Sequence, residues 1–221
     1  MRAAKYPEGV NKRELVGKLV GSEPARALEL ARSIPEPWYR CQSLAHVAWH
    51  LEDRKQFEKV IGEAVAAAYE QTEPNRIVTV ASWAVRAMVE RSDRRLSSVV
   101  DELLNKIQRQ ANPVRQADAL FYLFEAVFYE PRLRDLVLDA LLDACERMNS
   151  WKRPFLLSNI ALVFAKDDPD RAAQIVDMIG EGRKGRQTRR DIAAGKWLGP
   201  HEFFPYYAKP EDDDALDPKR T

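Results

Sequence analysis

The chain has 221 residues, with 35 Lys and Arg against 34 Asp and Glu, and a formal net charge of +1. This balance gives no overall attraction for nucleic acid, whose binding depends mainly on phosphate neutralisation, although locally clustered charge leaves nucleic acid possible. No run approaches the roughly 18 apolar residues of a membrane span, and the first residues lack the apolar core of a secretory signal. We therefore expect a cytoplasmic protein without a membrane partner.

The spacing of apolar residues predicts an all-α chain. Apolar side chains recur every three or four residues through most of the sequence, which is the helical period. Only 9 glycines occur in the chain, and β-branched runs are short. Cys41 and Cys145 fall inside helical patterns, where a free cysteine usually behaves as a small buried apolar residue.

A repeat is visible along the sequence. Residues 23–34, EPARALELARSI, align with residues 168–179, DPDRAAQIVDMI, sharing an acid, Pro, Arg, Ala and the last Ile. Between these ends, a short helix-breaking segment followed by an arginine recurs. We call these the marker arginines: Arg40, Arg76, Arg115, Arg153 and Arg189, spaced 36, 39, 38 and 36 residues apart. In the last unit, Arg186 is the alternative to Arg189, because both follow a glycine-rich turn. Self-similarity at such a period is typical of stacked helical hairpins.

In chain order, residues 1–20 form an N-terminal segment with a short capping helix. Residues 21–199 are predicted to form a right-handed α-solenoid of about four and a half hairpins, with a period near 37 residues. The first helices of the hairpins are expected near residues 24, 59, 98, 136 and 169, and each second helix follows a marker arginine. Residues 200–221 form an aromatic and then acidic tail.

The positions four, five and eight residues after the marker arginines are apolar in fourteen of fifteen cases. The flanking positions seven and nine residues after the first four marker arginines are apolar too, and they include Trp49, Trp83 and Tyr122. We therefore expect each second helix to be buried around more than half of its circumference, as an inner helix of a repeat array requires.

A narrow strip would remain exposed and, if these helices line the inside of the curve, would form a concave partner-binding surface. The strip residues are His46, His50, Ser82, Arg86, Asp118, Phe121, Glu125 and Asn159. Phe121, ringed by polar groups, could be a binding hot spot or could lie tucked between neighbouring helices.

The helical hairpins, the Asn112-Pro-Val-Arg115 turn and the arginine that opens each second helix resemble HEAT-like repeats of the armadillo type, over roughly residues 21–199. The resemblance implies a solenoid fold and a general habit of binding partners. It carries over no site residues.

Arginine-rich features have two interpretations. The marker arginines could form an anion-binding ladder, but we expect each to bond a carboxylate or a loop carbonyl of its own or the next repeat. Residues 182–190, GRKGRQTRR, hold the sharpest local charge and could bind phosphate, RNA or an acidic protein, or could be a solvated final turn. The anion-binding candidates are Arg183, Lys184, Arg186, Arg189 and Arg190.

No metal or cofactor site is predicted. His46 and His50 stand four residues apart on one helical face, but Val47 occupies the position where a zincin needs Glu, and no third ligand is fixed nearby. The glycines of residues 182–190 do not follow a strand, so they do not form a nucleotide-binding loop.

The tail contains four aromatic residues within residues 203–207, followed by the acidic run of residues 211–214. Because exposed aromatic rings are costly in water, we expect them to cap the open end of the array or to lie against it. The acidic run could neutralise the basic residues 183–190. The alternative is a linear motif for a partner.

These patterns predict a non-enzymatic scaffold that binds a protein or peptide on its concave face. The alternative is a nucleic-acid-binding HEAT-like protein, such as a DNA glycosylase of the alkylpurine type, a class that holds DNA on a basic concave face. Arg86 suits that alternative, whereas Asp118 and Glu125 would repel phosphates. No nucleophile, base and orienting group can be placed together, so no catalytic residue is predicted.

Overall fold

The computed structural model describes residues 8–204, which form eleven helices and contain no strand. The helices are α1 (Glu8–Leu19), α2 (Pro24–Arg32), α3 (Pro37–His50), α4 (Arg54–Tyr69), α5 (Pro74–Glu90), α6 (Leu96–Ile107), α7 (Pro113–Ala126), α8 (Pro131–Glu146), α9 (Arg153–Phe164), α10 (Pro169–Ile179) and α11 (Arg183–Ala193). The all-helical prediction is confirmed. The predicted first helices correspond to α2, α4, α6, α8 and α10, and the predicted second helices to α3, α5, α7, α9 and α11.

Proline and short polar caps determine where most helices begin. Proline occupies the first turn of seven helices, including α3, α5 and α7, where its missing N–H is least costly. The Asn112 side chain accepts hydrogen bonds from the backbone of Val114 and Arg115 at the start of α7. Two first helices begin five residues earlier than expected, because α4 starts after the capping residue Asp53 and α8 starts at Pro131.

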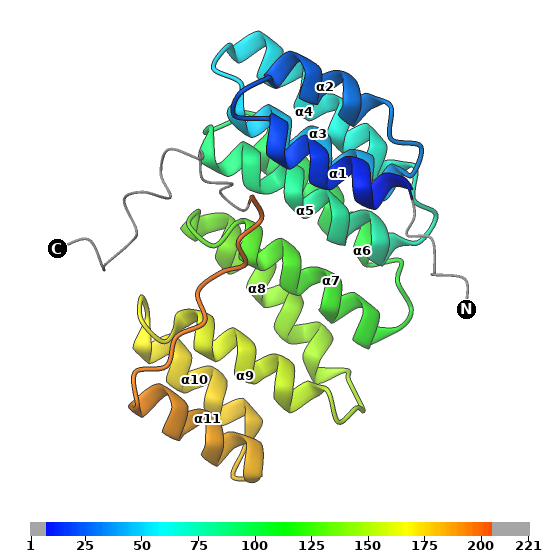
Figure 1. Cartoon of the computed structure of the whole chain (residues 1–221). Helices are drawn as coiled ribbons and strands as arrows, with labels where there is room; N and C mark the ends of the chain where they lie inside the picture. The colour runs from blue at the N-terminus through cyan, green and yellow to red at the C-terminus, as the bar shows by residue number, and fades with distance from the viewer. Residues whose placement is uncertain (1–7, 205–221) are drawn as a thin grey trace, which may run out of the picture.

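The helices are stacked side by side, from α1 and α2 at one end to α10 and α11 at the other (Figure 1). Helix α3 packs on α5, α5 on α7, α7 on α9 and α9 on α11. We call these five helices the second-helix row. Helix α1 packs on both α2 and α3, so the N-terminal segment extends this row.

The core lies along the second-helix row. The positions four, five and eight residues after the first four marker arginines are all buried: Leu44, Ala45, Ala48, Val80, Ala81, Ala84, Ala119, Leu120, Leu123, Leu157, Ser158 and Ala161. The corresponding prediction for α11 is wrong, because Ala193, Ala194 and Trp197 are exposed. Gly185 and Thr188 are the buried residues of that helix, and within residues 8–204 no further helix follows it to cover its other face.

Four of the marker arginines bond to turns and neighbouring helices. Arg40 donates to the carbonyls of Ile34 and Pro35. Arg153 donates to a carbonyl of the preceding helix, and Arg115 pairs with the carboxylate of Glu73. The expectation of a carboxylate or carbonyl partner in the same or the next repeat is confirmed for Arg40 and Arg153. It is also confirmed for Arg189, which pairs with Asp177 and Glu181. Arg115 differs, because Glu73 belongs to the preceding hairpin.

The sequence leaves the register of α11 open between Arg189 and Arg186. Arg186 donates to the carbonyl of Glu181, five residues earlier, just as Arg40 donates to the carbonyl of Pro35, five residues earlier. The buried residues of α11, Gly185 and Thr188, do not lie four, five or eight residues after either arginine.

After α11 the chain reverses and runs back across the second-helix row, as the orange-red segment of Figure 1 shows. Gly195, with φ 77°, permits the reversal. The backbone amide of Leu198 then donates to the carbonyl of Leu162, and the indole of Trp197 donates to the carbonyl of Val163. We call residues 195–204 the return segment.

No helix within residues 8–204 is both long and apolar enough to cross a bilayer.

Candidate functional site

The return segment carries a cluster of aromatic rings against α3, α5 and α7. The ring of Phe204 stacks on His46 and on Trp49, with centroid distances of 5.5 and 5.2 Å. Phe203 meets Trp83 edge to face at 5.3 Å. Both phenylalanines are buried, with 2% and 5% of their surface exposed. Three successive second helices thus supply rings to one extended segment.

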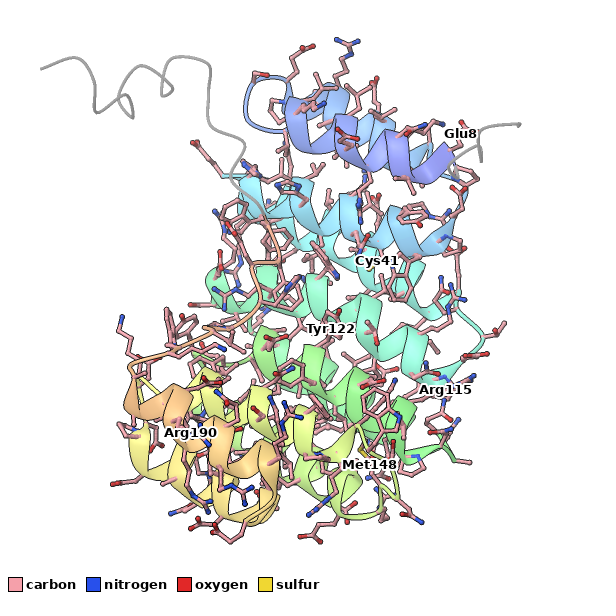
Figure 2. The ribbon with its side chains drawn as sticks, turned by 60° about the horizontal axis from the view of Figure 1, so that its bottom comes forward. Glu8, Cys41, Arg115, Tyr122, Met148 and Arg190 are labelled. Atoms are coloured by element: carbon pink, nitrogen blue, oxygen red, sulfur yellow. The ribbon has the colours of Figure 1, made fainter. Side chains whose placement is uncertain are left out.

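His201 continues this cluster towards α7. Its ring lies edge to face against Trp83 and Tyr122, with centroid distances of 5.9 and 5.8 Å. Figure 2 shows Tyr122 near the middle of the molecule, with Cys41 towards the α1 end and Arg190 towards the α11 end. The cluster therefore spans the central part of the second-helix row.

Glu125 on α7 fixes the path of the return segment. Its Oε1 accepts a hydrogen bond of 3.1 Å from the backbone amide of His201. Only 7% of the Glu125 surface is exposed. Burial raises the pKa of Glu125 from 4.5 to about 7, and the hydrogen bond from His201 offsets part of that rise. This carboxyl group therefore exchanges its proton near neutral pH.

His46 on α3 is a buried base beneath Phe204. Burial, assisted by the neighbouring His50, lowers the pKa of His46 from 6.5 to about 4. The imidazole is consequently neutral at physiological pH. It contributes a flat ring face to the cluster instead of a positive charge.

Three hollows adjoin the return segment, and His201 lines each of them. The first, of about 340 Å³, is lined by α1, α3, α5 and α7. The second, of about 560 Å³, is lined by α7 and α9, and we call it the α7–α9 hollow. The third, of about 640 Å³, is lined by α5 and α7 together with the return segment itself. The segment therefore leaves much of this face unfilled.

The predicted strip is only partly exposed. Asp118 and Asn159 are exposed, and His50, Arg86 and Phe121 are half-buried. The α7–α9 hollow brings together four strip residues: Asp118, Phe121, Glu125 and Asn159. This hollow is the part of the predicted strip that remains open.

Three strip residues are buried, and the expectation that they face open space is wrong. His46 lies under Phe204, and Glu125 lies under the backbone of His201. Ser82 has no exposed surface, and its hydroxyl donates to the carbonyl of Val78 one helical turn earlier. The return segment accounts for the first two residues, and helix packing accounts for Ser82.

Arg86 is engaged within its own helix. Its guanidinium pairs with Glu90 at 2.7 Å and lies over the ring of Tyr129, 5.1 Å from the centroid. The indole of Trp49 also donates to the Glu90 carboxylate. Arg86 thus joins a local network and is not an isolated positive charge.

The basic residues of α11 are partly neutralised. Arg189 pairs with Asp177 and Glu181, each at 3.1 Å, and Lys184 lies over the ring of Phe155 at 5.0 Å. Arg183 and Arg190 are exposed. The acidic run of residues 211–214 lies outside the described residues, as do the last aromatic residues of the tail. Anion binding at α11 stays a prediction.

The described part of the chain does not gather three or more His, Cys, Asp or Glu side chains into a set that could hold a metal ion. Cys41 and Cys145 are both buried free thiols. His46 and His50 have ring centroids 5.2 Å apart, and the rings of Trp49 and Phe204 pack around them.

Sequence reasoning missed the residues that hold the return segment. Trp49, Trp83 and Tyr122 occupy positions that the helical period assigned to the buried flanks of the second helices. The structure leaves Trp49 and Trp83 half-buried and Tyr122 exposed. Large aromatic residues on the flanks of three successive second helices were the available signal, because small aliphatic residues suffice for packing between helices.

Comparisons of the chain with protein-family models, with curated protein sequences and with solved structures gave no match. The geometry of the second-helix row is therefore the basis for assigning a function. Its main features are an extended segment, a cluster of rings and a buried carboxyl group.

Proposed function

We propose that this chain is a non-enzymatic, cytoplasmic scaffold, a right-handed α-solenoid of HEAT-like repeats that binds an extended peptide of a partner protein on its second-helix row. One observation carries the proposal: a segment of the chain itself lies extended across that row, with its rings on α3, α5 and α7. A face that accepts its own polypeptide in this way has the shape and chemistry to accept another.

The open part of the face is suited to contact with a protein. The α7–α9 hollow combines the half-buried ring of Phe121 with polar groups from Asp118 and Asn159. An aromatic side chain surrounded by polar groups is a common form of binding hot spot. The volume of about 560 Å³ falls within the range of ligand pockets.

The electrostatics of the face disfavour a nucleic acid. A phosphate backbone is bound by unpaired Lys and Arg side chains. Here Arg86 is paired with Glu90. The carboxyl groups of Asp118 and Glu125 line the α7–α9 hollow. We therefore favour a protein partner over a DNA- or RNA-binding role.

Site-specific photo-crosslinking tests the proposal. A photoreactive amino acid at position 159, inside the α7–α9 hollow, should give adducts with peptides of a partner protein in the native host. The same group at position 101, on the exposed surface of α6, serves as the control and should not give them. Nucleic-acid adducts at position 159, or the same adducts at both positions, would refute the proposal.

A further inference from the structure

The return segment has the geometry of a bound ligand. Its two phenylalanines are adjacent in sequence and occupy neighbouring places on α3 and α5. Phe204 stacks on Trp49 of α3 and also lies edge to face against Trp83 on α5, whereas Phe203 meets Trp83. The contacts are stacked and edge-to-face, the arrangements that aromatic rings prefer. The second-helix row thus contains adjoining places for two successive aromatic side chains.

We infer that the face formed by α3, α5 and α7 recognises two adjacent aromatic residues in an extended peptide of a partner protein, and that Phe203 and Phe204 occupy this place until the partner displaces them. The inference rests on the proposed function and specifies the chemistry of the partner. It also makes the return segment an intramolecular competitor for the binding face.

The backbone of the return segment is held by few bonds. In the described part of the chain, two hydrogen bonds tie the backbone of residues 197–204 to the helices: those from Leu198 to Leu162 and from His201 to Glu125. Leu198, His201 and Glu202 are exposed. The segment is therefore anchored by its aromatic side chains, with little contribution from backbone pairing, and another peptide carrying such side chains can replace it.

A partner peptide can also make contacts that the return segment does not make. The hollow of about 340 Å³ beside His201 is walled by the rings of Trp38, Trp83 and Tyr122 and bordered by the guanidinium of Arg13. Arg13 is hydrogen-bonded to the neutral side chain of Gln42. Side chains that fill this hollow would give an incoming peptide an advantage over the return segment.

Peptide binding in trans tests the inference on the full chain. The probe is a fluorescent peptide with the sequence of residues 195–204, and the control peptide carries Ala in place of both Phe. The protein variant is Phe203→Ala/Phe204→Ala. We expect it to bind the probe at least about tenfold more tightly than the unmodified chain, because a groove that is occupied in most molecules lowers the apparent affinity by the free fraction. The control peptide should not bind.

A reversible lock provides a second test if that variant folds poorly. The double substitution Tyr122→Cys/His201→Cys places two thiols on exposed residues whose rings now face each other, with centroids 5.8 Å apart, and a bis-maleimide reagent with a disulfide spacer joins them. Cys41 and Cys145 are buried and do not compete for the reagent. The crosslinked form should lose probe binding and regain it when the spacer is reduced, so that one protein serves as its own control.

Three results would overturn the inference. The probe could bind the unmodified chain and the Phe203→Ala/Phe204→Ala variant equally, or bind neither that variant nor the reduced double-cysteine protein. It could also bind only as the chain dimerises, which would assign the face to a second copy. The photo-crosslinking at position 159 tests the proposed function and does not depend on probe binding. A failure of the two-aromatic inference can therefore be distinguished from a failure of the proposed function.

Discussion

The backbone amide of His201 donates a hydrogen bond to the carboxyl group of Glu125, which lies 76 residues earlier in the chain. This bond joins the return segment to the middle of the second-helix row. The acceptor is buried, and its pKa of about 7 lies far above the ordinary value of 4.5. The attachment of the segment is therefore linked to pH.

Glu125→Gln should remove one pH-dependent part of the stability. Because the folded pKa is raised, the folded state holds this proton more tightly than the unfolded state. The stabilisation of the fold by protonated Glu125 is thus fully present below pH 4.5, and it is lost as the pH rises to about 7. Gln keeps an acceptor for His201 and carries no charge. In urea unfolding, the free energy of unfolding of the variant, relative to that of the unmodified chain, should rise by on the order of 3 kcal/mol between pH 4.5 and 7.

A control on another helix makes the Glu125 measurement specific. Asp101→Asn changes an exposed carboxyl group on α6, a helix that lines none of the three hollows, and it should not reproduce this rise in the free energy of unfolding. If the free energy of unfolding varies with pH in the same way for Glu125→Gln and for the unmodified chain, the buried carboxyl group of Glu125 does not cause the pH dependence.

His46→Gln should give a pH dependence of opposite sign. Its folded pKa of about 4 lies below the ordinary 6.5, so the unfolded chain binds this proton more readily. Stability from the neutral ring is therefore lost as pH falls from 6.5 towards 4. Because the variant lacks the stacking with Phe204, it should be less stable than the unmodified chain at every pH. This difference in the free energy of unfolding should become smaller as the pH falls. A difference that stays constant from pH 7 to 4 would contradict this prediction.

The helices and the core could be predicted from sequence because both follow from local periodicity. Leu120 and Leu123, for example, are buried as their spacing from Arg115 predicted. The return segment could not be predicted in the same way. It has no repeat to align and no helical period, and its contact with Glu125 joins distant parts of the chain. His46 and Glu125 were consequently assigned to an open strip.

The marker arginines should differ in their effect on stability. Arg40 is largely buried, with 19% of its side chain exposed, and it donates to two turn carbonyls as well as pairing with Glu70. Arg40→Ala should cost about 1 to 3 kcal/mol, because it leaves the part-buried carbonyl of Ile34 without this charged donor. Arg115 forms an exposed pair with Glu73, and Arg115→Ala should cost less than about 1 kcal/mol. If Arg115→Ala lowers the melting temperature more than Arg40→Ala does, this assignment is refuted.

Phe121 provides the sharpest test of the open part of the face. Its ring is half-buried, stacks on Phe124 at 6.2 Å and lines the α7–α9 hollow. Phe121→Ala should therefore cost about 2 kcal/mol of stability, less than the roughly 3 to 5 kcal/mol of a fully buried phenylalanine. The folded variant should give fewer partner adducts from the photoreactive group at position 159, because its hollow has lost the aromatic wall.

The matched control for Phe121 is Phe155→Ala on α9. Phe155 is a phenylalanine with 49% of its surface exposed. It packs against Trp151 and beneath Lys184, and it is not among the residues that line the hollow. Phe155→Ala removes the same side-chain atoms as Phe121→Ala, so it controls for a general loss of apolar surface. Adduct yield at position 159 should be unchanged by Phe155→Ala and lowered by Phe121→Ala. An equal loss in both variants, or none in either, would place the partner contact outside the α7–α9 hollow.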